Sequence, residues 1–145
     1  KCIGCGECTV TCPTQALEIS WKTDPDAIQE KIVEYAEGAL KNKQGKCGFI
    51  TFLTNISPQC DCYGWSDAPL VRDLGILASR DPVALDQACV DLVNRESVLP
   101  NSTLAGKEKA SDLFRTLYPS VDWTRQLVYA EEIGLGTRDY ELVKI

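Results

Sequence analysis

The first residues of this chain carry four cysteines at a spacing that constrains how the backbone must turn around them. The cysteines of this C-x2-C-x2-C-x3-C-P run are Cys2, Cys5, Cys8 and Cys12. Gly4 and Gly6 allow the left-handed backbone conformations that a tight loop around a metal cluster needs. Pro13 fixes its own φ and has no backbone donor, so it ends the loop. Because this spacing is typical of four thiolates around iron and sulfide, we predict that the four cysteines bind a 4Fe-4S cluster.

The run resembles the cluster motif of bacterial ferredoxins, in which the fourth cysteine ligates the other of two clusters. Cys2, Cys5 and Cys8 would then ligate one 4Fe-4S cluster and Cys12 a second cluster, whose other ligands would come from a second cysteine run that this sequence lacks. Either an upstream motif has been removed, as the start at Lys1 and the absence of Met also suggest, or the fourth ligand comes from later in the chain. The later cysteines are Cys47, Cys60, Cys62 and Cys89. A zinc site or a disulfide knot is the alternative for the run, although zinc sites usually pair two C-x2-C arms.

Composition narrows the remaining possibilities. At 145 residues the chain is long enough for one domain and a small appended module. With 44% hydrophobic residues it does not need disulfides, so we expect reduced cysteines and a cytoplasmic protein. There is no His, which leaves Cys as the only soft metal ligand. The net charge of -6, without a cluster of Lys or Arg, argues against nucleic acid, and no apolar run reaches the roughly 20 residues of a membrane helix.

The periodicity of the sequence predicts an α/β fold in which a mostly parallel sheet is flanked by helices. Residues 1–22 form the ferredoxin-type segment and residues 23–145 the α/β domain. Asp-Pro pairs at Asp24 and Asp81 predict capped helix starts. The apolar stretch 48–56 predicts a central strand buried on both faces. The predicted helices are 24–43, 82–95, 107–118 and 123–133, the predicted strands are 16–21, 48–56, 74–79 and 140–144, and 57–72 is a loop.

Cys60-Asp61-Cys62 is the other place where thiols come close. In an extended segment both side chains point the same way, so Cys60 and Cys62 could bind one metal. The alternatives are that the two cysteines form a vicinal dithiol or a strained disulfide, or that their proximity in sequence has no functional meaning. Ligands of open α/β sheets bind at the carboxyl ends of strands, so we expect this loop and the Asp81 helix start at the same edge. We interpret Cys89, on the apolar stripe of helix 82–95, and Cys47, beside strand 48–56, as small buried hydrophobes.

Three segments within residues 1–95 occur together: the N-terminal cysteine run, Asn55-Ile56 before Cys60-Asp61-Cys62, and the stretch 73–79 before Asp81-Pro82. This combination resembles the iron-sulfur-centre proteins of the domain-of-unknown-function family 362. The resemblance implies cluster content, a longer chain with further sequence ahead of the ferredoxin segment, and a site at positions 60, 61, 62 and 81. It implies no reaction or substrate.

These observations favour an iron-sulfur redox module that passes single electrons between a donor and a site near Cys60 and Cys62. The partner would be a redox protein or a small-molecule acceptor, with no role for nucleic acid or membrane. One alternative is an enzyme with a second metal at Cys60 and Cys62 and an acid or base among Asp61, Asp67 and Asp73. A structural zinc protein is the other.

Overall fold

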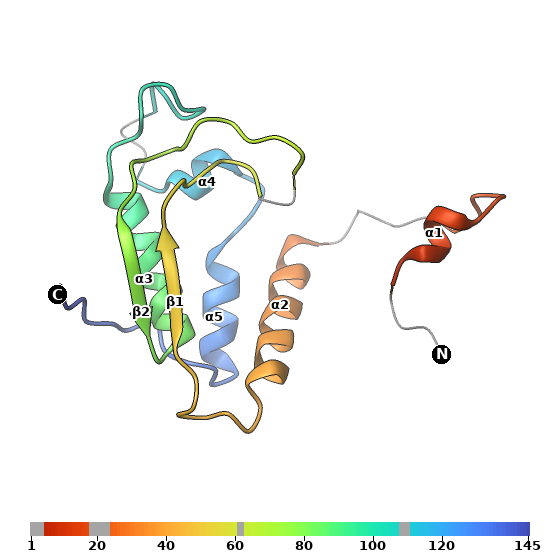
Figure 1. Cartoon of the computed structure of the whole chain (residues 1–145), viewed down its shortest axis with the longest axis horizontal. Coiled ribbons are helices and arrows are strands. Elements are labelled where there is room, and N and C mark those ends of the chain that lie inside the picture. The colour runs from red at the N-terminus through yellow and green to blue at the C-terminus, as the bar shows by residue number, and fades with distance from the viewer. Residues whose placement is uncertain (1–4, 18–23, 61–62, 108–110) are drawn as a thin grey trace.

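The computed structural model describes residues 5–17, 24–60, 63–107 and 111–145 (Figure 1). Its elements are α1 (Glu7–Thr11), α2 (Pro25–Leu40), β1 (Phe49–Leu53), β2 (Gly75–Ser79), α3 (Pro82–Arg95), α4 (Leu113–Leu117) and α5 (Thr124–Glu132). We call residues 5–17 the cysteine segment and residues 24–145 the α/β part. None of the helices in the described ranges is long and apolar enough to cross a membrane.

Most of the predicted elements are present. Helices 24–43, 82–95 and 123–133 are confirmed as α2, α3 and α5. The predicted helix 107–118 is represented by the shorter α4, and residues 108–110 lie outside the described residues. The predicted strand 16–21 also lies mostly outside them, and residues 140–144 form no strand.

Both Asp-Pro pairs begin helices as predicted. The Asp24 carboxylate accepts a hydrogen bond from the backbone N-H of Asp26 at 3.2 Å. At α3 the cap is stronger, because one oxygen of Asp81 accepts from the backbone N-H of Val83 at 2.8 Å and of Ala84 at 3.0 Å. These bonds satisfy donors that the first turn of a helix leaves unpaired, and proline fits the first helical position because it has no such donor.

The sheet differs from the prediction. β1 and β2 pair antiparallel, with Phe49 opposite Ser79 and Leu53 opposite Gly75, so the prediction of a mostly parallel sheet is wrong for the described strands. A parallel pair needs a crossover, usually a helix, between its strands. Here the connecting loop carries no helix in its described residues, and the chain returns directly alongside β1. Only the general α/β class holds.

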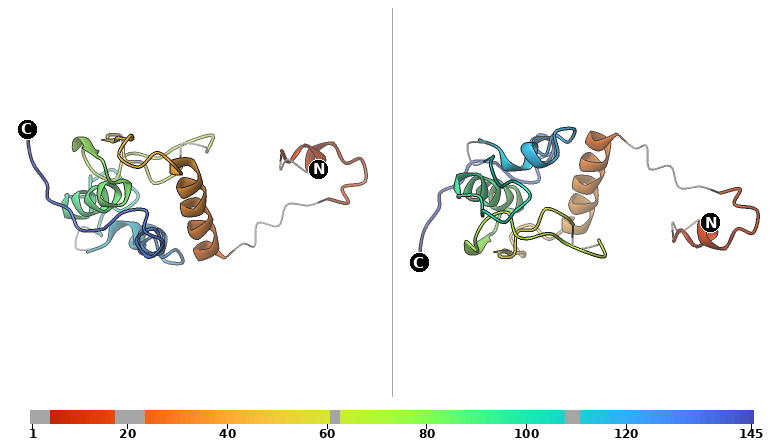
Figure 2. Two further views of the ribbon diagram at one scale, coloured as in Figure 1. Left: turned by 90° about the horizontal axis from the view of Figure 1, so that it is seen from below. Right: turned by 90° about the horizontal axis from the view of Figure 1, so that it is seen from above.

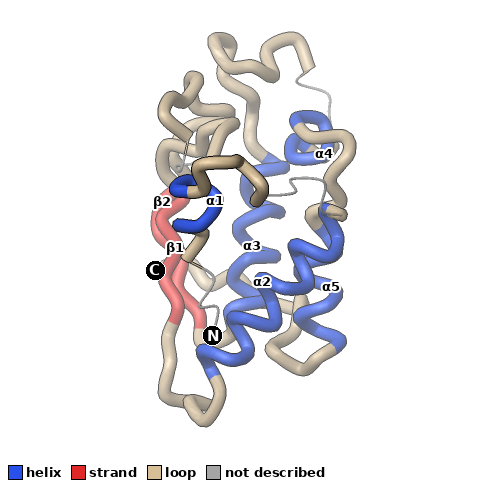
Figure 3. Tube along the Cα trace, turned by 90° about the vertical axis from the view of Figure 1, so that its right-hand side faces the viewer, coloured by secondary structure: helices blue, strands red, loops and turns tan. Residues whose placement is uncertain are grey.

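One face of the sheet is apolar and exposed, against the prediction that 48–56 is buried on both faces. Ile50 and Phe52 are 65% and 64% exposed, and Ile76, which lies opposite Phe52 on β2, is 63% exposed. Leu53, in contrast, is buried toward the core. The physical reason is that the long helices α2, α3 and α5 all lie on the same side of the strands (Figure 3).

Two clusters of buried side chains hold the α/β part together. The larger joins the strands, α3, α4 and the loops, and contains Leu53, Leu70, Val71, Leu85, Cys89, Val93, Val98, Leu104 and Leu113. The smaller joins α2, α3 and α5 through Val33, Val83, Leu127 and Ala130. Arg125 of α5 also donates a hydrogen bond of 2.7 Å to Glu30 of α2. The helix stripe with Leu85 and Cys89 therefore faces the core, as predicted.

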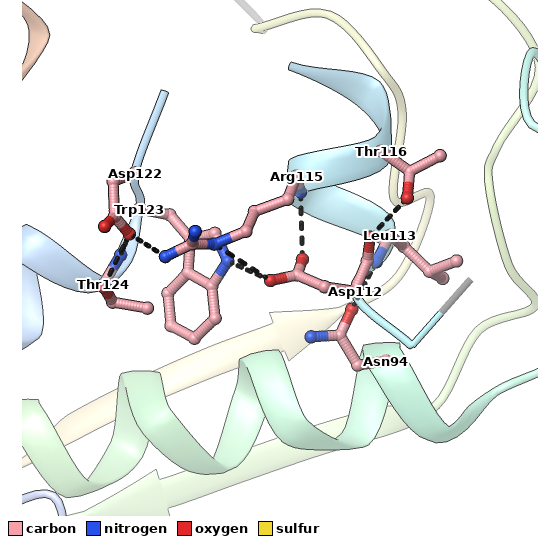
Figure 4. A network of polar contacts seen from close by, with 8 residues as sticks. All are labelled: Asn94, Asp112, Leu113, Arg115, Thr116, Asp122, Trp123 and Thr124. Carbon is pink, nitrogen blue, oxygen red and sulfur yellow. Dashed lines mark hydrogen bonds and ion pairs between the residues drawn. The ribbon is translucent and has the colours of Figure 1, made fainter. Parts of the chain in front are cut away.

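A polar network fixes the short helix α4 against its neighbours (Figure 4). The side chain of Asn94, from α3, accepts from the backbone N-H of Leu113 at 2.9 Å. The carboxylate of Asp112 accepts from the backbone N-H of Arg115 and from the indole N-H of Trp123, both at 2.9 Å. Because α4 is too short to be stable alone, these contacts and the burial of Leu113 determine its position.

Candidate functional site

The cysteine segment places two of its thiols in solvent. Cys5 and Cys8 are exposed and Cys12 is partly exposed, while Cys2 lies outside the described residues. Gly6, between Cys5 and Cys8, has φ 74°, the left-handed conformation that the motif predicted at such a position. Cys8 lies on α1, and Cys12 ends that helix with extended backbone.

The surroundings of Cys12 favour the thiolate form of its side chain. Its sulfur lies 3.5 Å from the Thr14 hydroxyl. Hydrogen bonds from the Thr14 side chain and from the backbone N-H groups of Ala16 and Thr14 lower the pKa of Cys12 from 9.0 to about 7. The thiolate is the form that binds metal, so the local backbone supports a ligand role for this residue.

The thiols of the segment do not converge in the described structure. No group of three or more His, Cys, Asp or Glu side chains in the described ranges is arranged to hold a metal ion. The donor chemistry of four cysteines nevertheless fits an iron-sulfur cluster, and α1 is a five-residue helix that no other helix or strand of the described part contacts (Figure 2). A helix this short is marginal by itself, so metal binding can reorganise it at small cost.

Cys60, the first residue of the C-x-C pair, is exposed in the loop after β1, and Asp61 and Cys62 lie outside the described residues. Hydrogen bonds made by residues near Cys60 fix the position of this loop. The backbone N-H of Leu70 donates to the carbonyl of Ile56 at 2.8 Å, and the Tyr118 hydroxyl donates to the carbonyl of Pro58 at 2.6 Å. Cys60 is thus presented on a loop whose two ends are closed by hydrogen bonds.

The two described carboxylates proposed as acid or base both accept hydrogen bonds from neighbouring groups of the protein. Asp67 accepts from the Thr103 hydroxyl and from the backbone N-H of Ala68, both at 2.8 Å. These bonds lower the pKa of Asp67, so it stays ionised and is unsuited to donate a proton near neutral pH. Asp73 accepts from the backbone N-H of Asn55, at 2.8 Å, where Asn55 has φ 50°.

Cys60 and Asp81 are not brought together. Because β1 and β2 are antiparallel, the end of β2 lies beside the start of β1, and Ser79 is opposite Phe49. Asp81 therefore lies at the opposite end of the sheet from the loop that carries Cys60 (Figure 1). The expectation that both occupy one edge is wrong, since it depended on parallel strands. Asp81 caps α3 and also accepts from the backbone N-H of Thr137 at 2.9 Å.

The two remaining cysteines have different surroundings. Cys89 is buried in the larger core cluster, where burial, followed by the charge of Asp86, raises the pKa of its thiol. It packs as a small hydrophobic side chain. Cys47 is only half-buried and lies in the wall of a cavity of about 590 Å³ at the start of β1.

Sequence reasoning missed this cavity. Lys41, Lys43 and Arg80 line it, and Lys46 follows in the same loop, so three lysines occur in residues 41–46. This local concentration corrects the view that the chain has no Lys cluster, and it is the signal that could have drawn attention to the region. The contribution of Arg80, which is distant in sequence, could not be seen without the fold.

Comparison with models of protein families identifies the family of the chain. A family model described as Domain of unknown function (DUF362) matches residues 5–91, which is more than half of the chain and includes the cysteine segment, both strands and most of α3. Searches of curated proteins and of solved structures found no match. The chain therefore belongs to the DUF362 family.

Proposed function

We propose that this chain is an iron-sulfur electron-transfer module in which Cys2, Cys5, Cys8 and Cys12 bind a 4Fe-4S cluster. The observation that carries the proposal is the C-x2-C-x2-C-x3-C-P spacing on a segment that exposes the thiols of Cys5 and Cys8. Free cysteines are more often buried, as Cys89 is, because a thiol packs like a small hydrophobic group. Two exposed thiols on a short segment have no packing role to explain them.

The surrounding residues supply what a thiolate cluster site needs. Gly6 turns the backbone between Cys5 and Cys8 through a conformation that a residue with a Cβ rarely adopts. Thr14 and the N-H groups after Pro13 lie close to the Cys12 sulfur, and such hydrogen bonds to sulfur are one means by which proteins adjust cluster potentials. A bound 4Fe-4S cluster supplies one-electron transfer.

An electron acceptor is proposed at the loop with Cys60 and Cys62. This loop is fixed by the hydrogen bonds of Leu70 and Tyr118 and presents Cys60 to solvent. Its exposed Tyr63 and Trp65 are in edge-to-face contact, with ring centroids 6.3 Å apart. An exposed thiol and two exposed aromatic rings on a tethered loop suit the approach of a redox protein or a small-molecule acceptor.

The test is anaerobic reconstitution with iron and sulfide, followed by metal analysis, of the wild-type chain and of two serine variants. Cys5→Ser should lose iron, whereas Cys60→Ser should keep the visible spectrum of the cluster while losing electron transfer to the acceptor. The buried Cys89→Ala is the control and should keep both. Stoichiometric zinc without a reducible chromophore would refute the proposal. Loss of the cluster in Cys60→Ser would instead show that Cys60 takes the place of Cys12 as the fourth ligand, which would contradict the proposed ligand set and remove the proposed acceptor site.

A further inference from the structure

A cavity of about 590 Å³ lies at the end of the sheet away from the Cys60 loop. Its walls come from the end of α2, the loop that leads to β1, the start of α3 and the residues after α5. In Figure 1 these segments meet at the lower end of the molecule, whereas the loop after β1 lies at the upper end. The cavity is therefore separate from both cysteine sites of the proposed function.

The charge around this cavity is opposite to that of the whole chain. Lys41, Lys43 and Arg80 line the cavity together with one carboxylate, that of Glu37, so the ionised groups sum to +2 from three cations and one anion. The chain as a whole has a net charge of -6. None of these three cations forms an ion pair in the described part of the chain. An uncompensated positive site in an acidic protein attracts anions selectively.

The rim of the cavity is held in place by the protein. Arg80 donates a hydrogen bond of 2.7 Å to the carbonyl of Gly45, and Lys43 donates to the carbonyl of Ala39. Asn42 and Gly45 have φ values of 64° and 70°, so the loop between α2 and β1 turns sharply at both. These bonds to neutral carbonyls orient Arg80 and Lys43 and leave their charge available to a ligand.

The same cavity offers apolar surface beside the charges. Leu40, Phe49, Pro82 and Leu135 form part of its lining, and the half-buried thiol of Cys47 lies among them. Sites for small molecules combine apolar walls with a few well-placed polar groups in this way. The expected ligand therefore has an apolar body as well as a negative charge.

We propose that this cavity binds a small phosphomonoester with an apolar body. The phosphate is held by Lys41, Lys43 and Arg80, and the apolar part lies against Phe49 and Leu135. Three cations facing one carboxylate suit a dianion better than a monoanion, which favours phosphate over carboxylate. This inference does not depend on the iron-sulfur cluster.

The experiment is titration of the full chain with phenyl phosphate, inorganic phosphate and benzoate by calorimetry. Phenyl phosphate should bind most tightly, because it provides both the dianion and the apolar ring. In parallel, alkylation of Cys47 by iodoacetamide is followed by peptide mass spectrometry, and phenyl phosphate should slow it while leaving Cys60 unaffected. Failure of both phosphates to bind, or benzoate binding as tightly as phenyl phosphate, would overturn the proposal.

Charge-reversal variants locate the binding. Lys41→Glu should weaken phenyl phosphate binding by about tenfold or more, because a repulsion replaces an attraction. Lys107→Glu, which makes the same change of charge outside the cavity, should change it by less than about twofold, since distant exposed charges are screened. Equal losses in both variants would show a nonspecific effect of net charge and contradict the site. Arg80→Gln, which keeps a donor for the Gly45 carbonyl, is the second variant should Lys41→Glu fold poorly.

Discussion

The cysteine segment and the α/β part hold their thiols in opposite environments. Cys5 and Cys8 are exposed on a segment without buried side chains in its helix, whereas Cys89 is 8% exposed within the larger core cluster. The α/β part is stabilised by burial of apolar side chains, which requires no metal. The segment has no such core and is organised by local hydrogen bonds. We infer that the fold of the α/β part is independent of metal, and we propose that metal binding adds further order to the cysteine segment.

The largest effect should come from the core of the α/β part. Leu85→Ala removes a side chain that is 5% exposed and leaves a cavity, so the free energy of unfolding should fall by about 2 to 5 kcal/mol in urea denaturation. Cys89→Ala, on the same stripe, removes a single sulfur and should cost much less. Similar costs at both positions would show that the packing of this stripe against the strands is described wrongly.

A smaller effect is expected at the start of α3. Asp81→Ala removes a carboxylate that accepts hydrogen bonds from the backbone N-H groups of Val83, Ala84 and Thr137. The free energy of unfolding should fall by about 1 to 2 kcal/mol. The matched variant Asp24→Ala at α2 loses one exposed bond of 3.2 Å and should cost about 0.5 kcal/mol. Urea denaturation of the two proteins measures both values. Equal losses would show that the hydrogen bond between Asp81 and Thr137 does not contribute to stability.

A titration tests the local order of the cysteine segment in metal-free protein. The pKa of Cys12 is lowered, so the hydrogen bonds to its thiolate are fully present above 9.0 and are lost as the pH falls through about 7. The rate of alkylation at Cys12 should therefore have its midpoint near pH 7, and Thr14→Val should move that midpoint upward. Thr11→Val removes a hydroxyl that bonds the Glu7 carbonyl and should leave it unchanged. An unmoved midpoint in Thr14→Val would show that Thr14 does not stabilise the thiolate.

The smallest expected effect on the α/β part is that of metal removal. Chelation of iron should leave its unfolding midpoint in urea unchanged, because neither buried cluster contains Cys5, Cys8 or Cys12, the described cysteines of the N-terminal run. Backbone amides in residues 5–17 should lose protection from hydrogen exchange in the same sample. A large drop in the stability of the α/β part would show that the two regions are coupled.

Local signals in the sequence predicted the helices well and the sheet poorly. The signals for the helices are local in sequence. Asp24 and Asp81, each followed by proline, stand directly before the helices that they cap, and the apolar periodicity lies within the helices. Strand pairing joins residues that are distant in sequence. An apolar stretch such as 49–53 therefore does not reveal which strand it pairs with or whether the pair is parallel or antiparallel. It also does not reveal whether a second layer covers Ile50 and Phe52. The direction of the strands and the exposure of one sheet face are therefore known only from the structure.

The same limit applies to the candidate sites. The cysteines of the run are neighbours in sequence, so their spacing alone is enough to predict them as cluster ligands. The association of Cys60 with Asp81 was inferred from parallel strands and failed when the strands proved antiparallel. The basic cavity joins Lys41 and Lys43 to Arg80 only through the fold, since a contact across 35 positions has no signature in the sequence.

Low-temperature EPR of the full chain after anaerobic reconstitution and reduction tests whether the N-terminal cysteine run holds a 4Fe-4S cluster. We expect about four iron and four sulfide per chain, a visible absorption that bleaches on reduction and a 4Fe-4S signal. The signal should disappear in Cys8→Ser and persist in Cys89→Ala, because Cys8 is exposed in the run and Cys89 is buried in the core. Bound zinc without a reducible chromophore, or a signal that survives in Cys8→Ser, would refute a 4Fe-4S cluster at these cysteines.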